Sequence, residues 1–462
     1  MDPRMCVDSL SAPLPEDILK RKWAGDLEGA VQAIDRRLSR ELPEMLRARL
    51  ICERERIRRL PTQYPWNRAQ ALEKLRELVP AVTEQQFDDL ELSGCIDFIY
   101  LHGEKRYFVR FHRSIARHPD LMRQAGKEVS QVNDWLDPMI REIKEKGSLT
   151  RRITMETSVS VEKEDFLPGE YLVHLPFPAP SAQQSDIRLL AGDPDGIAPE
   201  DAPARTAHWH RHLETWRAFS LQYSYVSSIK YADPLHQPAP ASPLYPNVPP
   251  PCAEDLAESG AFMRFTPYLK RLEADLARDA SSSAIKAWKY YEFVTTKVDY
   301  SFMRDYFQID SLNEYCAVNL RGDCGLQALL FIILCRIGGI PARWQSGLSI
   351  SEDYSGSHDW AQFYLEGWGW LFADCSYGGS AYRYGSAERH QFYFGNLDPM
   401  RMVANRAFQA ELTPGLSVLR VDPYDNQSGE VERIGAELPF TMRQMDGQAR
   451  LIAYETLRQA SN

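Results

Sequence analysis

The sequence is poor in features that mark several common classes of protein. None of its 8 cysteines belongs to a Cys-x-x-Cys pair, which argues against a structural zinc site. The chain has no run of about 18 apolar residues, so no membrane-spanning helix is expected. Residues 1–23 lack the apolar segment of a secretory signal. We therefore expect a cytoplasmic protein, without contact to a membrane, whose cysteines are free thiols.

Positive charge is also scarce. The 54 Lys and Arg residues are outnumbered by 64 Asp and Glu residues, and the formal net charge is −10. This balance disfavours a protein whose main partner is nucleic acid or anionic lipid. One basic cluster stands out at residues 54–59, where four arginines are interleaved with glutamate. We interpret this cluster as the solvent-facing side of a helix, with a nucleic-acid patch as the alternative.

The hydrophobic patterns predict an α+β multidomain chain, because 462 residues are enough for two to four domains. Residues 1–148 are expected to form a helical region. Within it, two helices and a hairpin over 65–115 resemble a winged-helix unit. The second of these helices should begin at Thr83, since Gln86 completes a capping-box pattern.

The hydrophobic pattern of the sequence changes after this helical region. Residues 149–235 alternate between apolar and polar side chains, as at Ile153, Met155 and Val159, which predicts a β-sandwich-like domain. A proline-rich linker follows at 236–260. We expect the catalytic core over 261–462, with a terminal helix at 440–459.

A cysteine lies where an apolar helix is expected to begin. Residues 322–325 read Gly-Asp-Cys-Gly, and a long apolar run follows Cys324. The free backbone N–H groups and the dipole of a helix N-terminus favour a thiolate over a thiol. Since the thiolate is the reactive form, Cys324 is the candidate nucleophile. Cys335, further along the same run, is interpreted as a small buried hydrophobic residue.

A histidine and an aspartate follow in an order that suits this cysteine. His358 opens an alternating segment that reads as a strand, and a glycine turn leads to a second strand that ends at Asp374. A hairpin of these strands would bring Asp374 beside His358, where it would orient the imidazole of a Cys–His pair. We therefore predict a Cys-His-Asp triad, and regard separate structural roles for the three residues as the less favoured alternative.

Four segments around these residues resemble the core of the transglutaminase-like superfamily. They are GDCG at 322–325, RIGGIPAR at 336–343, HDW at 358–360 and WLFAD at 370–374. The resemblance is strong over 285–380 and extends more weakly to the β region before it, whereas residues 1–147 have no counterpart. It implies a papain-like α+β core. One departure is the sequence Cys-Ser-Tyr-Gly-Gly after Asp374, which alters the rim of the site and weakens any analogy of substrate.

The resemblance also implies a mechanism. Cys324 would attack a carboxamide or peptide carbonyl to form a thioester, while His358 takes the thiol proton and later protonates the leaving amine. The oxyanion would be held by the backbone N–H of Cys324 and by an upstream side chain. Tyr315, Asn319 and Tyr300 are the candidates for that side chain. The candidates for contact with substrate are Asp323, Gln327, Trp344, Trp360 and Tyr377, although the aromatic ones fit a core role as well.

The function expected from the sequence is thus thiol-dependent acyl transfer on peptide or glutamine-type amide bonds, with hydrolysis slightly favoured over cross-linking. A peptide or protein substrate is expected, and neither a cofactor nor a metal is, because no acidic calcium loop occurs. The alternative is a non-catalytic scaffold or interaction protein with the same fold. Nucleic-acid binding through residues 1–115 is a minor added possibility, and the sequence leaves the oligomeric state open.

Overall fold

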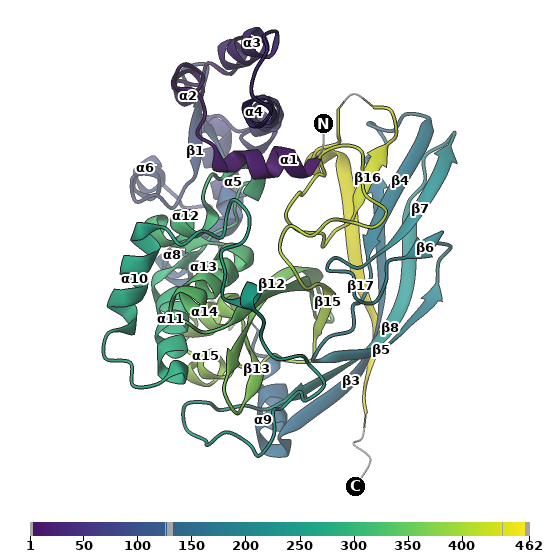
Figure 1. Ribbon diagram of the computed structural model, residues 1–462. Coiled ribbons are helices and arrows are strands. Elements are labelled where there is room, and N and C mark those ends of the chain that lie inside the picture. The colour runs from purple at the N-terminus through teal and green to yellow at the C-terminus, as the bar shows by residue number, and fades with distance from the viewer. Residues whose placement is uncertain (1–2, 125, 127–132, 437, 458–462) are drawn as a thin grey trace.

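The computed structural model describes residues 3–124, 126, 133–436 and 438–457. These residues build a mixed α/β fold, with helices on one side and two antiparallel sheets on the other (Figure 1). A further sheet, of five strands, lies between them and carries the transglutaminase-like motifs. Within the described residues, no helix is long and apolar enough to cross a membrane.

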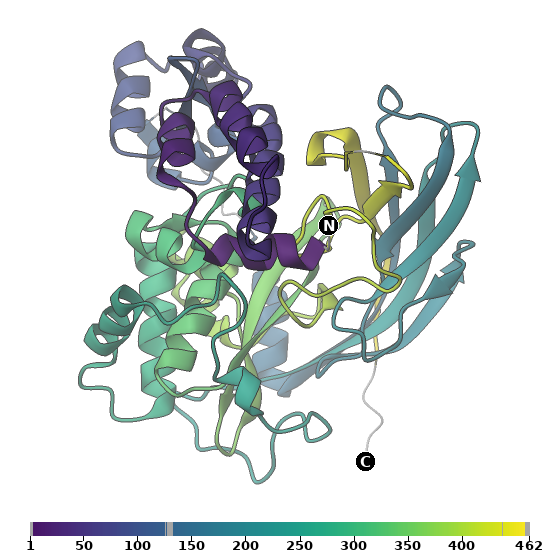
Figure 2. The same ribbon diagram turned by 45° about the horizontal axis from the view of Figure 1, so that its top comes forward.

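The N-terminal region is mainly helical. Its leading helices stand above the rest of the molecule (Figure 2), whereas its last helix, Leu136–Lys146, lies at the opposite end, beside β3 (Ser148–Val161) (Figure 1). Its elements are α1 (Pro3–Asp8), η1 (Ser9–Ser11), α2 (Glu16–Trp23), α3 (Leu27–Leu38), α4 (Glu44–Gln63), α5 (Arg68–Leu78), α6 (Glu84–Leu92), β1 (Phe98–Leu101), β2 (Glu104–Tyr107), α7 (Phe111–Ile115), α8 (Pro119–Gln124) and α9 (Leu136–Lys146). Helix α6 begins as predicted, because Thr83 and Gln86 form a reciprocal capping box. The predicted hairpin is the β1–β2 pair, whose turn places His102 and Gly103 at positive φ. The winged-helix resemblance of this unit stays a prediction.

Helix α4 corrects the interpretation of the basic cluster. Arg56 and Arg59 are almost completely buried, at 0% and 1% exposure, so they do not belong to a solvent-facing side. Arg56 donates to the carbonyl of Phe307 over 2.7 Å and forms an ion pair with Asp310 at 2.7 Å. Arg59 donates to the carbonyls of Arg420 and Val421, over 3.1 and 2.9 Å.

The interpretation failed because a charge pattern on one helix does not reveal what packs on it. Guanidinium groups tolerate burial when carbonyls and carboxylates satisfy their N–H groups, and both arginines meet this condition. Helix α4 therefore joins the N-terminal region to loops of the C-terminal half. Of the four arginines, Arg54 does keep the expected exposure, in an ion pair with Asp35.

Two four-stranded antiparallel sheets face each other on the opposite side of the molecule (Figure 1). Their strands are β3 (Ser148–Val161), β4 (Gly169–Pro176), β5 (Gln184–Ala191), β6 (Gly196–Ile197), β7 (Thr206–Leu213), β8 (Phe219–Lys230), β16 (Glu430–Arg433) and β17 (Met445–Thr456). One sheet has the order β17-β3-β8-β5 and the other the order β16-β4-β7-β6. The predicted alternation is confirmed in β3, where Ile153, Met155 and Val159 are buried. Both sheets thus draw a strand from the C-terminal tail.

The terminal helix expected at 440–459 is wrong. Met445–Thr456 forms β17 instead, and residues 458–459 lie outside the described residues. The strand pairs antiparallel with β3, from Met445 opposite Val161 to Thr456 opposite Arg151. The backbone groups on the open edge of β3 favour this pairing, which overrides the local preference of the segment.

The remaining elements form the part of the chain that carries the motifs. They are η2 (Ala253–Asp255), α10 (Pro267–Ala277), α11 (Ser283–Lys297), β9 (Asp299–Tyr300), η3 (Tyr306–Gln308), α12 (Leu312–Asn319), β10 (Arg321–Gly322), α13 (Cys324–Ile337), β11 (Ala342–Ile350), β12 (Ser355–Leu365), β13 (Gly369–Ala373), α14 (Cys375–Arg383), α15 (Ala387–Phe392), β14 (Phe394–Gly395), β15 (Arg401–Asn405) and η4 (Met442–Gln444). The central sheet has the order β14-β13-β12-β11-β15. Helix α13 packs on β11 and β12 and is buried from Gly325 to Arg336, which explains its long apolar run.

Candidate active site

Cys324 is the first residue of α13, as the sequence predicted. Asp323 caps the helix, because its carboxylate accepts the backbone N–H of Leu326 over 3.2 Å. The hydroxyl of Tyr306 donates to the same carboxylate oxygen over 2.5 Å. At Gly325, a side chain would lie 2.1 Å from that hydroxyl oxygen, so only glycine fits beneath Tyr306. The thiol is thereby held at the start of a fixed helix.

The electrostatic surroundings of Cys324 differ from the expectation. Its thiol donates a hydrogen bond to Oδ2 of Asp359 over 3.2 Å. Burial raises the pKa of Cys324 well above its usual value, and the carboxylates of Asp359 and Asp323 raise it further. The preference for a thiolate expected at the helix N-terminus stays a prediction, and burial together with the two carboxylates next to the sulfur opposes it.

His358 and Asp374 lie together, as the hairpin of β12 and β13 predicted. Nε2 of His358 is 2.7 Å from Oδ2 of Asp374. The same carboxylate accepts from Arg401 over 3.0 Å and from the backbone N–H of Tyr377 over 2.9 Å. Burial opposes ionisation of Asp374, but the charges of His358 and Arg401 and these hydrogen bonds lower its pKa. Asp374 is thus an ionised carboxylate that fixes the imidazole.

The thiol and the imidazole are connected through neighbouring residues of β12. Successive side chains of a strand point to opposite faces, so Asp359 turns toward α13 while His358 packs on the ring of Tyr377. Within the described residues, no hydrogen bond joins Cys324 to His358 or occupies Nδ1 of His358. In the tautomer of His358 that donates from Nε2 to Asp374, Nδ1 is free to act as an acceptor.

Two cavities meet at this point. The first, of about 250 Å³, contains Cys324 and is called the carboxylate-lined cavity, after Asp305, Asp323, Asp359, Asp422, Asp425 and Glu430. The second, of about 220 Å³, contains His358 and is called the arginine-lined cavity, after Arg117 and Arg383. Tyr300, Phe302 and Ser357 line both cavities. The nucleophile candidate and the base candidate therefore face spaces of opposite charge that share a wall.

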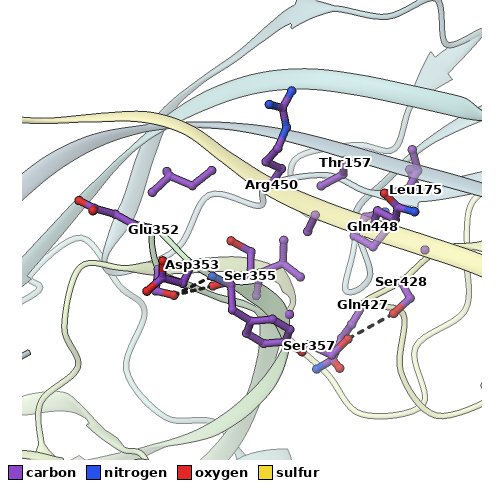
Figure 3. A pocket seen from close by; sticks show the side chains of 18 residues that line it. Thr157, Leu175, Glu352, Asp353, Ser355, Ser357, Gln427, Ser428, Gln448 and Arg450 are labelled. Atoms are coloured by element: carbon purple, nitrogen blue, oxygen red, sulfur yellow. Dashed lines mark hydrogen bonds between the residues drawn. The ribbon is translucent and has the colours of Figure 1, made fainter. Parts of the chain in front are cut away.

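A third cavity, of about 430 Å³, adjoins the first one (Figure 3). It lies between the loop from β11 to β12 and strand β17, with Glu352 and Asp353 on one side and Arg450 on the other (Figure 3). Ser357 and Ser428, joined by a 3.2 Å hydrogen bond, line both this space and the carboxylate-lined cavity. Strand β17 of the neighbouring sheet thus contributes to the surroundings of the site.

The other residues singled out from the sequence divide into two groups. Tyr300, Asp323 and Tyr377 line the two cavities. By contrast, Tyr315 stacks with Arg304, and Asn319 donates to the carbonyl of Tyr315. Neither lines one of the described cavities, so only Tyr300 keeps a position suited to an oxyanion donor.

Three candidates for substrate contact lie in the core. Trp360 is fully buried and donates to Gln345, and Trp344 packs on Phe408. Gln327 is buried within α13, where its amide donates to the carbonyl of Gly322. None of the three lines a described cavity, so the packing role left open for the aromatic residues suits both tryptophans.

Asp359 is the site residue that the sequence did not single out. It is the middle residue of the HDW motif, and strand alternation turns its side chain to the face opposite His358. Asp425 and Gln427 also approach Asp359, and both come from a tail segment with no recognisable motif. The sequence does contain a signal for this residue, because Asp359 directly follows His358 and lies on the same strand, β12.

Comparison with known proteins identifies the central part of the chain. The family model of the transglutaminase-like superfamily matches residues 270–375, a range that includes Cys324, His358 and Asp374. These residues form a transglutaminase-like domain, which confirms the resemblance seen in the sequence motifs. No curated protein matches the chain.

Several solved structures are similar at low identity. A candidate cysteine protease of Cytophaga hutchinsonii is 13% identical, with a TM-score of 0.39, over 67% of this chain and 90% of that one. The periplasmic domain of TgpA from Pseudomonas aeruginosa is 13% identical, with a TM-score of 0.28, over 55% of this chain and 96% of that one. These TM-scores are too low to transfer an activity to this chain.

Proposed function

We propose that the chain is a thiol-dependent acyl-transfer enzyme that acts on peptide or glutamine-type amide bonds, with hydrolysis slightly favoured over cross-linking. The proposal assigns Cys324 as nucleophile, His358 as base and Asp374 as the residue that orients the base. The observation that carries it is the 2.7 Å contact of His358 with Asp374, one residue along β12 from the partner of the Cys324 thiol. The transglutaminase-like match over these residues supports the same assignment.

The chemistry follows from the free nitrogen of His358. In the proposed reaction, Nδ1 takes the proton of the Cys324 thiol, and the sulfur attacks the carbonyl carbon. The charge that forms on the carbonyl oxygen is stabilised by the backbone N–H of Cys324 and by the hydroxyl of Tyr300. Burial raises the pKa of Tyr300 well above its usual value, and the neighbouring Cys324 and Asp323 raise it further, so its hydroxyl remains a donor.

The intermediate is resolved in a second half-reaction. When the carbon–nitrogen bond breaks, the leaving amine takes the proton from His358, and the acyl group stays on Cys324 as a thioester. A water molecule then gives a proton to His358 and attacks the thioester carbon. The acid is released, the proton returns to the sulfur, and the resting hydrogen bond to Asp359 forms again.

One observation favours the alternative of a non-catalytic scaffold. The thiol of Cys324 donates to Asp359 instead of His358, and its pKa is raised, as expected for an unreactive cysteine. An enzyme with this resting state must move the thiol proton to His358 when substrate arrives, whereas a scaffold need not. The two functions therefore differ in whether His358 affects the reactivity of Cys324.

A thiol probe separates these possibilities. Iodoacetamide alkylation of Cys324 is measured by mass spectrometry as a function of pH, in the parent chain and in His358→Ala, with Cys324→Ala as the blank. An enzyme should show a histidine-dependent inflection below the thiol pKa, and His358→Ala should slow alkylation at about pH 6 by roughly 10-fold or more. Identical pH profiles in both chains would exclude a Cys–His pair and favour the scaffold.

The partners and the location remain predictions from the sequence. A peptide or protein substrate fits the proposed chemistry, and nucleic acid, a cofactor and a metal are not part of it. The cytoplasmic location has no support from the comparisons, in which one similar structure is a periplasmic domain.

A further inference from the structure

The carboxylate-lined cavity has more carboxyl groups than basic groups in its lining. Six carboxyl side chains line it, against the two guanidinium groups of Arg110 and Arg304. Arg304 already pairs with Asp97, at 3.4 Å, outside the cavity. Arg110 donates to the carbonyl of Met303 and lies over the ring of Phe302. Within the described residues, Glu430 is the one carboxyl group of the six with an ion pair, to Arg420 at 3.6 Å, so the lining is short of positive charge.

Asp359, beside Cys324, and its neighbour Asp425 have no ion pair within the described residues. Asp359 accepts from the Cys324 thiol and from the amide of Gln427. Asp425 accepts from Ser346 over 2.7 Å and from Asn405 over 2.8 Å. Burial raises the pKa of both carboxyl groups. In Asp359 the charge of Asp425 and a hydrogen bond between the two side chains raise it further, whereas that hydrogen bond lowers the pKa of Asp425.

Asn426 is an independent sign of a missing partner. Asn426 lines this cavity and is only 3% exposed. Neither its Oδ1 nor its Nδ2 has a hydrogen-bond partner within the described residues. An unsatisfied buried amide is unfavourable, so a ligand that supplies a donor to its Oδ1 gains binding energy.

We propose that the carboxylate-lined cavity binds a primary ammonium group of the substrate, so that Cys324 acts on amides or peptides that carry an amine near the reacting carbonyl. The proposal rests on the proposed function and adds the substrate class. Three N–H donors of an ammonium group match Oδ1 of Asn426 and the carboxylates of Asp359 and Asp425. Its charge also offsets the repulsion between those carboxylates.

The arginine-lined cavity favours one orientation of the substrate across the two cavities. Arg117 and Arg383 line it without an ion pair to any carboxylate of the described residues, and the hydroxyls of Ser376 and Ser380 lie beside them. An ammonium group is repelled there and attracted on the Cys324 side. A metal ion is a poorer occupant of the carboxylate-lined cavity, because no three His, Cys, Asp or Glu side chains of the described residues are arranged to hold one.

The test uses three methanethiosulfonate reagents that attach a methyl, a 2-aminoethyl or a 2-sulfonatoethyl thio group to a thiol. The thiolate of Cys324 attacks the sulfenyl sulfur, a mixed disulfide forms, and methanesulfinate leaves. Rates at Cys324 are measured by mass spectrometry and divided by the rates with glutathione. The ammonium reagent should exceed the neutral one by on the order of 10- to 100-fold, and the sulfonate should be the slowest.

Two variants locate the effect. Asp359→Asn and Asp422→Asn should each lower the ratio of ammonium to sulfonate rates several-fold, and Asp422→Asn does so without touching the sulfur. Asp275→Asn, on the exposed face of α10, makes the same change in net charge and should leave the ratio unchanged. Equal normalised rates for all three reagents, or a ratio that survives both cavity variants, would overturn the proposal.

The outcome is independent of catalysis, since these reagents need only an accessible thiol. A chain that discriminates between the reagents but shows no His358-dependent reactivity would keep the ammonium site and lose the proposed enzyme function. A chain with the reverse behaviour would keep the enzyme and lose the ammonium site.

Discussion

The carboxyl groups that contact His358 and Cys324 differ in their partners. Asp374, beside His358, pairs with Arg401, and its pKa is lowered. Asp359, beside Cys324, accepts from the thiol and from Gln427 and has no ion pair within the described residues, and its pKa is raised. The carboxyl group that orients the base is therefore paired with a cation of the protein, and the one that contacts the nucleophile is not.

Because of this difference, the proposed base and the proposed nucleophile are in different states before substrate binds. The base is ready at rest, because Asp374 fixes the ring of His358 through Nε2. The thiol is kept protonated, because Asp359 and Asp323 oppose its ionisation. A nucleophile that ionises only when its surroundings are neutralised is protected from oxidation and alkylation in the absence of substrate.

The largest expected effect is on stability and distinguishes the two carboxylates. Asp374→Ala removes the carboxylate partner of His358 and one of the two carboxylates that pair with the buried Arg401, so the free energy of unfolding should fall by about 3–5 kcal/mol. Asp359→Asn, the corresponding change beside Cys324, should alter it by less than about 1 kcal/mol, since no ion pair of the described residues is lost. Urea unfolding of both variants measures the difference, and equal losses would contradict the contrast between the two carboxyl groups.

The second prediction concerns the wall of the carboxylate-lined cavity. Arg59→Met leaves the buried carbonyls of Arg420 and Val421 without donors, and the free energy of unfolding should fall by about 2–3 kcal/mol. Arg54→Met is the matched control on the same helix, because Arg54 forms only an exposed ion pair. Thermal unfolding of both variants provides the measurement. Similar losses in both would mean that burial on α4 does not matter.

A third, smaller effect is expected on the reactivity of Cys324. Asp359→Asn removes a carboxyl group that raises the pKa of Cys324, so this pKa should fall and iodoacetamide should react about 10-fold faster at neutral pH. Asp353→Asn, on the exposed loop before β12, should leave the rate unchanged. If Asp359→Asn slowed the reaction instead, its carboxyl group would have to assist the thiol.

The smallest effect is a change in the pH dependence of stability. Burial and the charge of Asp425 raise the pKa of Asp422 to about 7. Between the ordinary carboxyl pKa and about 7, the folded chain keeps a proton that the unfolded chain has lost, so stability falls as the pH rises through this window. Asp422→Asn cannot ionise and should show a smaller fall between about pH 5 and pH 7.5 in urea titrations. An unchanged slope would show that Asp422 titrates normally.

The sequence predicted those parts of the site that depend on local patterns. Cys324 begins a helix and His358 and Asp374 lie in one hairpin, and each of these positions follows from nearby residues. Asp425 could not be placed, because its approach to Asp359 brings together distant parts of the chain. The strand at Met445–Thr456 was missed for the same reason, since the edge of β3 and not the segment itself decides its conformation.

The contacts of helix α4 matter when sequences with the same motifs are compared. Its buried Arg56 and Arg59 hold the loops that bear Phe307 and Val421, two residues that line the space beside the nucleophile, yet the helix lies far outside the matched residues 270–375. Two chains with the same core motifs but different N-terminal regions would therefore differ in the shape of the cavity beside the nucleophile. The family match over residues 270–375 therefore leaves out a helix that helps to shape the cavity beside Cys324.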